Sequence, residues 1–474
     1  MSCAASFRIE KDLLGTLEVP ADAYFGIQTL RAVNNFHLSG VPLSHYPKLV
    51  VGLAMVKQAA ADANHQLGHL SSEKHAAISE ACARLIRGDF HDQFVVDMIQ
   101  GGAGTSTNMN ANEVIANIAL EAMGHAKGEY KHLHPNNDVN MAQSTNDAYP
   151  TAIRLGLLLG HDALLASLDS LIQAFAAKGQ EFSHVLKMGR TQLQDAVPMT
   201  LGQEFRAFAT TLTEDLNRLR SLAPELLTEV NLGGTAIGTG INADPGYQHL
   251  AVERLAIISG QPVVPAADLI EATSDMGAFV LFSGMLKRTA VKLSKICNDL
   301  RLLSSGPRTG INEINLPARQ PGSSIMPGKV NPVIPEAVNM CAFEIMGNDL
   351  ALTVAAEGGQ LQLNVMEPLI AYKIFDSIRL LQRAMDMLRE HCIVGITANE
   401  QRCRELVEHS IGLVTALNPY IGYENATRIA RVALETGRGV LELVREEGLL
   451  DDVMLADILR PENMIAPRLV PLKA

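Results

Sequence analysis

Residues 276–300, MGAFVLFSGMLKRTAVKLSKICNDL, decide the fold class of this chain. Positions alternately three and four residues apart form a seam along the stretch. All but one of them are apolar: Met276, Phe279, Ser283, Leu286, Ala290, Leu293, Cys297 and Leu300. A heptad-like seam of this kind packs along a neighbouring helix in a near-parallel bundle. The stretch therefore predicts a long core helix within a mainly α-helical protein.

Prolines limit this helix and others, because proline interrupts a helix interior. The chain has none between residues 265 and 307, between 150 and 198, or between 335 and 368. Each gap is long enough for an extended helix. Asp268 followed by Glu271 is typical of a helix start, and Ser-Ser-Gly-Pro at 304–307 is typical of a helix end.

Three regions are expected along the chain. Residues 1–142 form an N-terminal helical domain, with helices such as 46–66 and 72–87. Residues 143–396 form the central long-helix bundle, interrupted by a Pro/Gly-rich loop at 306–335. The third region, residues 397–474, is a small C-terminal helical domain. Long amphipathic helices with few charges on several faces also predict an oligomer, whose size this reasoning leaves open.

Composition narrows the class of protein. The chain has 474 residues, 47% hydrophobic and 19% charged, as expected of a folded soluble protein, and its net charge of −12 argues against nucleic-acid binding. We find no signal peptide, and no apolar run approaches the roughly 18 residues of a membrane helix. Six scattered cysteines without metal spacing indicate reduced thiols in a cytoplasmic protein. We predict neither a metal site nor a cofactor.

The loop GSSIMPGKVN at 322–331 combines two serines, a lysine and an asparagine ahead of a helix-like segment. Serine is a poor base in water, so in that role it needs nearby positive charge and exclusion of solvent. Lys329 and a helix N-terminus would supply positive potential. Simpler interpretations stay open at this point. Asn331 with Pro332 also fits a helix N-cap, and Lys329 also fits a solvated surface lysine.

Three other segments are rich in small hydroxyl and amide residues: GGAGTSTN at 101–108, QSTND at 143–147 and MGRTQLQD at 188–195. Such side chains can bind a dicarboxylate through many neutral hydrogen bonds, with one lysine adding charge. Each segment alone has a structural interpretation. The first fits a flexible loop with capping residues, and Ser144 fits the N-cap of the next helix.

Together these four segments resemble the fumarase/aspartase superfamily of lyases along nearly the whole chain, and GSSIMPGKVN is highly specific for it. The resemblance implies a three-domain, mainly α fold and a homotetramer in which three subunits build each active site. It implies that Ser323, as its alkoxide, is the catalytic base and that Gly322 and Gly328 are hinges of a closing loop. The substrate-binding residues that it implies are Thr105, Ser144, Thr145, Asn146, Thr191, Ser324, Lys329 and Asn331.

The resemblance also divides the implied residues by role. The β-carboxylate would accept hydrogen bonds from Thr105, Ser144, Thr145 and Ser324. The α-carboxylate would be held by Thr191, Lys329 and Asn331. Asn146 would orient the ammonium group.

Within the family, residues 295–308, 312–317 and 332–336 look closer to the aspartases than to the fumarases. Gln192 is the main chemical difference, because fumarases that resemble this chain carry histidine there. Hydroxide needs a proton donor to leave, since the pKa of water is about 15.7, whereas ammonium leaves as neutral ammonia.

The resemblance therefore implies reversible deamination of L-aspartate to fumarate and ammonia. It implies anti elimination through an enediolate (aci-carboxylate) intermediate. Fumarate hydratase is the closest alternative function. A non-catalytic structural protein of the same fold is the second.

Overall fold

A computed structural model describes residues 6–465 of the chain. The chain forms two compact units. The first comprises Met1–Ala166, Asn217–Ala290 and Phe343–Gln382, and the second comprises Ser167–Leu216, Val291–Ala342 and Arg383–Ala474. The boundaries fall within the long helices, so each unit contains part of the bundle. The division into three domains stays a prediction.

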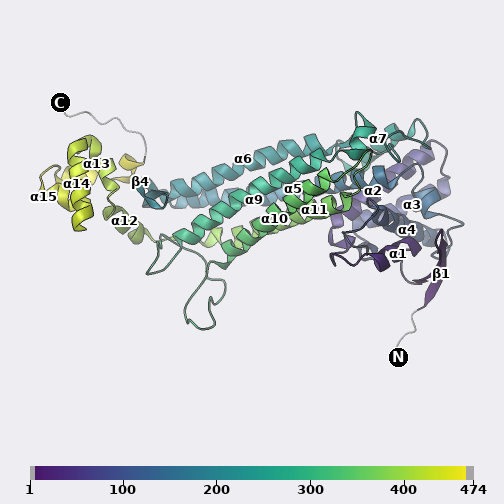
Figure 1. Cartoon of the computed structure of the whole chain (residues 1–474), viewed down its shortest axis with the longest axis horizontal. Coiled ribbons are helices and arrows are strands. Elements are labelled where there is room, and N and C mark those ends of the chain that lie inside the picture. The colour runs from purple at the N-terminus through teal and green to yellow at the C-terminus, as the bar shows by residue number, and fades with distance from the viewer. Residues whose placement is uncertain (1–5, 466–474) are drawn as a thin grey trace. The chain divides into compact units, whose positions relative to one another are not determined.

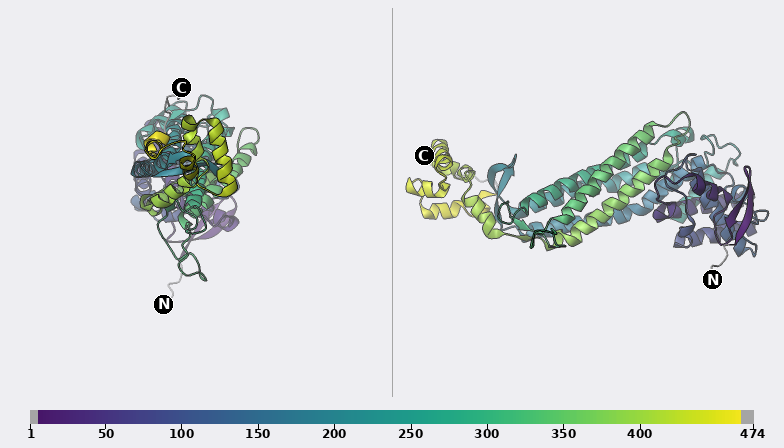
Figure 2. Two further views of the ribbon diagram at one scale, coloured as in Figure 1. Left: turned by 90° about the vertical axis from the view of Figure 1, so that its left-hand side faces the viewer. Right: turned by 60° about the horizontal axis from the view of Figure 1, so that its bottom comes forward.

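Long helices run side by side in both units (Figures 1 and 2): α5 (Thr145–Glu181), α6 (Leu201–Leu227), α9 (Gly277–Leu303), α10 (Val333–Glu357) and α11 (Glu367–His391). The predicted mainly α fold with a long-helix bundle is confirmed. The predicted seam is the buried face of α9, where every seam residue is at most 3% exposed. Its polar member, Ser283, donates a hydrogen bond to Asp349 Oδ1 at 2.8 Å.

The predicted start of the long helix is wrong. Asp268 caps a separate short helix, α8 (Leu269–Ser274), through its side-chain oxygen, which accepts the N–H groups of Ile270 and Glu271. The backbone turns extended at Asp275, and α9 begins only at Gly277. A capping pair marks the start of a helix but carries no information about its length.

Shorter elements complete the two units. The first unit also contains α1 (Ile27–Asn35), α2 (Pro47–Gln66), α3 (Ser72–Arg87), α4 (Thr105–Ala122) and α7 (Tyr247–Ser259). Helices α2 and α3 lie within one residue of their predicted bounds. The second unit also contains α12 (Glu400–Glu408), α13 (Leu413–Ile421), α14 (Tyr423–Thr436), α15 (Val440–Glu446), α16 (Asp452–Ile458) and α17 (Pro461–Met464).

Strands occur in pairs. Antiparallel pairs are β1 (Phe7–Asp12) with β2 (Gly15–Pro20), β3 (Leu186–Thr191) with β4 (Gln194–Thr200), and β7 (Ile314–Asn315) with β8 (Thr397–Ala398). The strands β5 (Glu229–Val230) and β6 (Val264–Pro265) are parallel. The β3–β4 hairpin contains the segment GRTQLQD, for which no strand was predicted.

No apolar run in α5 approaches 18 residues, since Arg154, His161 and Asp162 interrupt it, yet the helix is apolar on average. By length and composition alone, an 18-residue window of this helix could cross a membrane, with a mean hydropathy of 1.4. However, 56% of that window is buried inside the protein. A helix at the centre of a bundle is apolar on most of its faces, so burial accounts for this composition.

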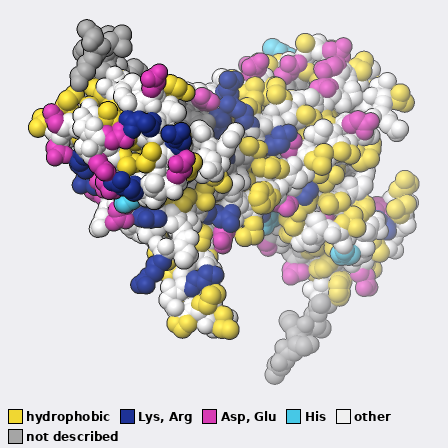
Figure 3. Space-filling model, turned by 60° about the vertical axis from the view of Figure 1, so that its left-hand side comes forward, with side chains coloured by type: hydrophobic (Ala, Val, Ile, Leu, Met, Phe, Trp, Pro, Cys, Tyr) yellow, Lys and Arg dark blue, Asp and Glu magenta, His cyan; other side chains and the backbone are white. Residues whose placement is uncertain are grey.

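Hydrophobic side chains are spread over much of the surface, among charges of both signs (Figure 3). In the first unit, α10 exposes Phe343, Leu350 and Val354 by 58, 66 and 60%. Their spacing of seven and four residues places them on one face of the helix. Apolar side chains grouped on one exposed helix face in this way mark contact surfaces.

Candidate functional site

The nine residues predicted for the site fall into two groups. The first unit contains Thr105, Ser144, Thr145 and Asn146, and the second contains Thr191, Ser323, Ser324, Lys329 and Asn331. Within the second group, four residues share the loop 322–331, and Thr191 lies on the β3–β4 hairpin.

Two helix N-termini carry the first group. Thr105 is the first residue of α4 and Thr145 the first residue of α5. A hydrogen bond from Asn108 Nδ2 to Thr145 Oγ1, at 3.2 Å, connects the two starts. Gly104 precedes α4 with φ at +89°, and a Cβ there would lie 2.3 Å from the ring of Tyr149. Residues 105–108, which could have been a loop, thus form the first turn of α4. The N-termini of α4 and α5 both present positive potential to an anion.

Ser144 is the N-cap of α5, as its structural interpretation predicted. Its Oγ accepts the N–H of Asn146 at 3.2 Å, and Asp147 Oδ1 accepts the N–H of Ser144 at 2.9 Å. The Ser144 oxygen accepts in this contact, so its own proton remains a donor. Capping and ligand binding by Ser144 are therefore compatible.

A glycine-rich segment at 231–240 lies against the start of α5. Asp147 Oδ2 accepts the N–H groups of Gly233 at 3.0 Å and Thr235 at 2.9 Å, and Asn146 Nδ2 donates to Ala236 O at 2.8 Å. Sequence reasoning missed this segment as part of the site. The signal was the glycine density of GGTAIGTG at 233–240.

A buried lysine lies beneath the same helix starts. Lys57 of α2 is 0% exposed, and its Nζ donates to the side-chain oxygens of Asn108 at 2.6 Å, Asn140 at 2.9 Å and Gln143 at 2.9 Å. Burial lowers the pKa of Lys57 and raises the pKa of Asp147, and the charge of each opposes the shift of the other. Sequence reasoning also missed Lys57. The feature that could have revealed it is its position as the one lysine in the mostly apolar stretch 49–63.

The loop 322–331 holds the Ser323 oxygen in a pocket of backbone donors. Ser323 Oγ accepts the N–H groups of Ile325 at 3.2 Å and Met326 at 3.0 Å. Successive N–H groups of this kind stabilise a negatively charged oxygen. The ends of the loop are tied together, because Asn331 Nδ2 donates to Gly322 O at 2.7 Å and Gly322 N donates to Lys329 O at 2.7 Å.

One interpretation of this loop is wrong. Asn331 does not cap the next helix with Pro332 as its first residue, because α10 begins at Val333 and the Asn331 amide closes the loop instead. Gly322 permits a close approach, since a Cβ there would lie 2.7 Å from Lys329 O, and its role as a hinge stays a prediction. Gly328, with φ at +80°, takes the left-handed backbone that glycine favours.

The β3–β4 hairpin presents Thr191 beside a strained turn. Gln192 and Leu193 form the two-residue turn with φ at +55° and +63°. Turns of this kind usually contain Asn-Gly, because left-handed backbone strains other residues by about 1–2 kcal/mol each. Such strain concentrates at functional sites.

Replacing Leu193 by glycine is expected to stabilise the protein by about 0.5–1 kcal/mol, because glycine relieves the left-handed strain at a small entropic cost. Leu193 is 69% exposed, so little packing is lost. Urea unfolding measures the change. Leu193→Ala is the matched control, since it removes the same side chain and keeps the strain. Equal stability of the two variants would contradict a strained turn.

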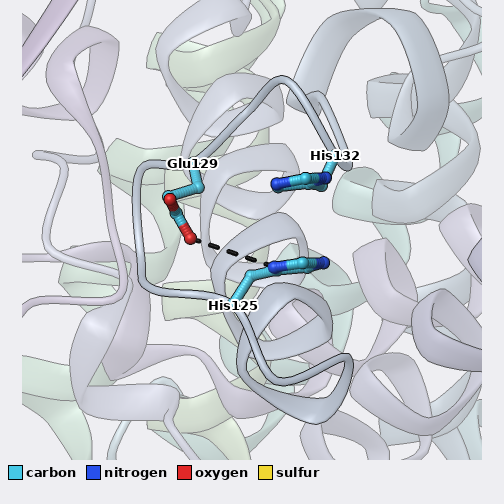
Figure 4. Close-up of side chains that lie close together, drawn as sticks. All are labelled: His125, Glu129 and His132. Carbon is cyan, nitrogen blue, oxygen red and sulfur yellow. Dashed lines mark ion pairs between the residues drawn. The ribbon is translucent and has the colours of Figure 1, made fainter.

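Away from these segments, His125, Glu129 and His132 lie close enough to hold a metal ion, with their ligand atoms within 4.8 Å of one another (Figure 4). However, the imidazole rings of His125 and His132 are stacked, with centroids 3.7 Å apart and planes at 2°. A ligated ion lies near the plane of each imidazole, and parallel planes share no such point. As arranged, the group is a ring stack with an ion pair from His125 Nδ1 to Glu129 Oε2 at 3.9 Å. The absence of a metal site stays a prediction.

Comparison with known protein families identifies the family of this chain. The sequence model of the family described as Lyase matches residues 15–347, and the model described as Fumarase C C-terminus matches residues 413–466. The chain belongs to the fumarase/aspartase superfamily of lyases. The predicted family is confirmed, and each segment quoted for the resemblance lies within the first match.

Relatives within the superfamily cover the whole chain. The chain is 92% identical to an aspartate ammonia-lyase of Pseudomonas canavaninivorans, over 100% of both chains. It is 90% identical to an aspartate ammonia-lyase of Pseudomonas aeruginosa, again over 100% of both. Among solved structures, a fumarate lyase:delta crystallin from Brucella melitensis, bound to cobalt, is 60% identical with a TM-score of 0.94 and covers 98% of this chain and 100% of its own.

Proposed function

We propose that this chain is a carbon–nitrogen lyase that converts L-aspartate reversibly to fumarate and ammonia. Full-length relatives at 90–92% identity, named aspartate ammonia-lyases, support this substrate over malate. The cytoplasm is the expected location. A non-catalytic protein of the same fold is not favoured, because the loop keeps Ser323, Lys329 and Asn331.

The donor pocket at Ser323 is the observation that supports base chemistry best. An unassisted serine hydroxyl is a poor base at neutral pH. The N–H groups of Ile325 and Met326 stabilise its alkoxide and so favour loss of the hydroxyl proton. Ser323 then removes a proton from the carbon beside the β-carboxylate of aspartate, and the electron pair moves into that carboxylate as an enediolate.

Donors at the two helix N-termini suit this enediolate. Its extra negative charge falls on the β-carboxylate oxygens, where Ser144, Thr145 and Ser324 donate. A preorganised donor of this kind contributes roughly 3 kcal/mol to the transition state. Thr105 Oγ1 donates to Gly102 O at 2.8 Å and must exchange that hydrogen bond to donate to the substrate as well. The intermediate collapses by expelling ammonia, which leaves as the neutral molecule and requires no proton from the protein.

Thr191, Lys329 and Asn331 hold the α-carboxylate in this proposal. Lys329 is an exposed residue of the loop 322–331, and its ammonium group supplies the positive charge. Asn146 orients the ammonium group beside the β-carboxylate donors. Gln192, next to Thr191, cannot donate a titratable proton, which fits ammonia better than hydroxide as the leaving group.

We also propose a homotetramer with active sites shared between three subunits, and the apolar face of α10 supports association of the chain into an oligomer. Phe343, Leu350 and Val354 on this face are more than half exposed in the single chain. Burial of such a face against a second copy stabilises an obligate oligomer. Residues that are far apart in the sequence, such as Thr145 and Ser323, then meet across subunits.

Mixing two inactive variants tests shared sites. Ser323→Ala and Thr145→Ala should each lose most activity, because each damages every site. Mixed tetramers formed by dissociating and reassembling the two proteins should regain activity, since some sites then receive both intact residues from different subunits. Aspartate turnover, followed as fumarate absorbance, is the readout. If mixing restores nothing although mixed tetramers are present by mass spectrometry, sites are not shared.

The substrate is tested by offering L-aspartate and L-malate separately to the purified protein. We expect fumarate from aspartate and little or none from malate. Fumarate from malate alone would identify the chain as a fumarase and refute the proposal.

A further inference from the structure

We propose that Lys57 is a positioning residue for the reaction, acting through Asn108 to fix the Thr145 hydroxyl as a donor to the negatively charged intermediate. The inference rests on the proposed function, because it concerns the same β-carboxylate. Lys57 itself does not touch substrate in this account.

The surroundings of Lys57 select the ammonium form. Three amide oxygens, from Asn108, Asn140 and Gln143, lie within 2.6–2.9 Å of its Nζ. An ammonium has three protons to donate, so each oxygen is satisfied. A neutral amine has two protons and a lone pair, which would leave one oxygen facing that lone pair. The facing charged group is Asp147 of α5, whose negative charge also favours the ammonium.

The orientation of Asn108 carries the effect to the site. Its Oδ1 accepts from Lys57, so its Nδ2 must point the other way, and it donates to Thr145 Oγ1 at 3.2 Å and to Asn140 Oδ1 at 3.1 Å. A hydroxyl that accepts at its oxygen still has one proton to give. Lys57 therefore fixes the amide, the amide occupies the Thr145 oxygen, and the Thr145 proton is left for the substrate.

The buried charge also acts on the intermediate directly. Lys57 is 0% exposed, so water screens its field weakly. The enediolate carries one more negative charge than the β-carboxylate of the substrate. The field of Lys57 therefore stabilises the intermediate more than the substrate, which is the condition for a higher rate.

The test compares two forms of one ligand that differ in this charge. The nitro form of 3-nitropropionate has a neutral nitro group, whereas its nitronate form is planar and carries one more negative charge, at the place where the enediolate carries it. Lys57→Met should weaken binding of the nitronate form by at least about tenfold more than binding of the nitro form, because the lost charge acts at low dielectric. Calorimetry on the folded tetramer gives both dissociation constants.

Two further variants keep this test informative. Asn108→Leu keeps Lys57 but removes the amide link to Thr145, and it should also shift the ratio of the dissociation constants of the nitronate and nitro forms, even if Lys57→Met fails to fold. Lys74→Met is the matched control. Lys74 pairs with both oxygens of Asp138 at 2.8 and 2.9 Å in the same unit, outside this network. Its loss should lower stability and leave the ratio unchanged.

The outcomes separate this inference from the proposed function. A selective loss of nitronate affinity in Lys57→Met or Asn108→Leu supports the positioning role. Equal loss for both forms, or none, in folded variants overturns it and makes Lys57 purely structural. Wild-type protein that deaminates aspartate in that case leaves the proposed function intact. Wild-type protein that does not deaminate aspartate refutes the proposed function itself.

Discussion

Replacing Ser323 by alanine is expected to lower kcat for aspartate deamination by about a hundred- to ten-thousand-fold, the usual contribution of a positioned general base. The substitution removes the oxygen that accepts from the N–H groups of Ile325 and Met326. It should change KM much less, because the carboxylate donors remain. Steady-state kinetics with L-aspartate, on protein confirmed as folded and assembled, measures the effect.

Ser305→Ala is the matched control for this prediction. Ser305 lies in the same unit, and its Oγ likewise accepts a loop N–H, that of Ile311 at 3.0 Å. We assign it no part in the reaction, so its loss should leave kcat nearly unchanged. Wild-type turnover by Ser323→Ala, or an equal loss in both variants, would remove Ser323 from the role of base.

Replacing Glu313 by alanine is expected to destabilise the protein by about 3 kcal/mol, because it leaves buried positive charge without its partner. Glu313 is 0% exposed and contacts Lys187 Nζ and Arg190 Nη1, each at 2.8 Å. Both cations lie on β3, the strand that ends at Thr191. Lys187 keeps its second partner, Glu204, at 2.6 Å, which limits the loss. Urea unfolding measures the stability.

The same substitution should raise KM for aspartate, since it loosens the strand that presents Thr191 to the α-carboxylate. Glu442→Ala is the control. Glu442 pairs with Arg438 on an exposed surface of the same unit, where water screens the charges, so neither stability nor KM should change measurably. If Glu313→Ala is as harmless as Glu442→Ala, the ion-pair cluster does not anchor the hairpin.

Long-range periodicity made the helical core predictable. The seam from Met276 to Leu300 is buried as expected, because its spacing follows from helix geometry alone. Local sequence signals gave less information about where a helix or strand begins and ends. The capping pair at Asp268 begins α8 rather than α9, and the strained turn at Gln192 lies in a hairpin for which no strand was predicted.

The site was predictable only where residues form compact motifs. The loop 322–331 and the segment 143–147 could be recognised as contiguous sequence motifs. Lys57 could not, because its role comes from three amide oxygens brought together from α4 and from residues 140–143. Asn331 shows the reverse case. Its local pattern fits a helix cap, yet its amide closes the loop through Gly322 O.

The most direct test of the central claim runs the reaction backwards in one vessel. Fumarate and ammonium are incubated with the purified protein in deuterated water, and the products are followed by proton NMR. We predict aspartate carrying a single deuterium at the β-carbon, in one configuration set by anti addition, with no malate. Malate as the main product would contradict the account, because the protein would then add water rather than ammonia.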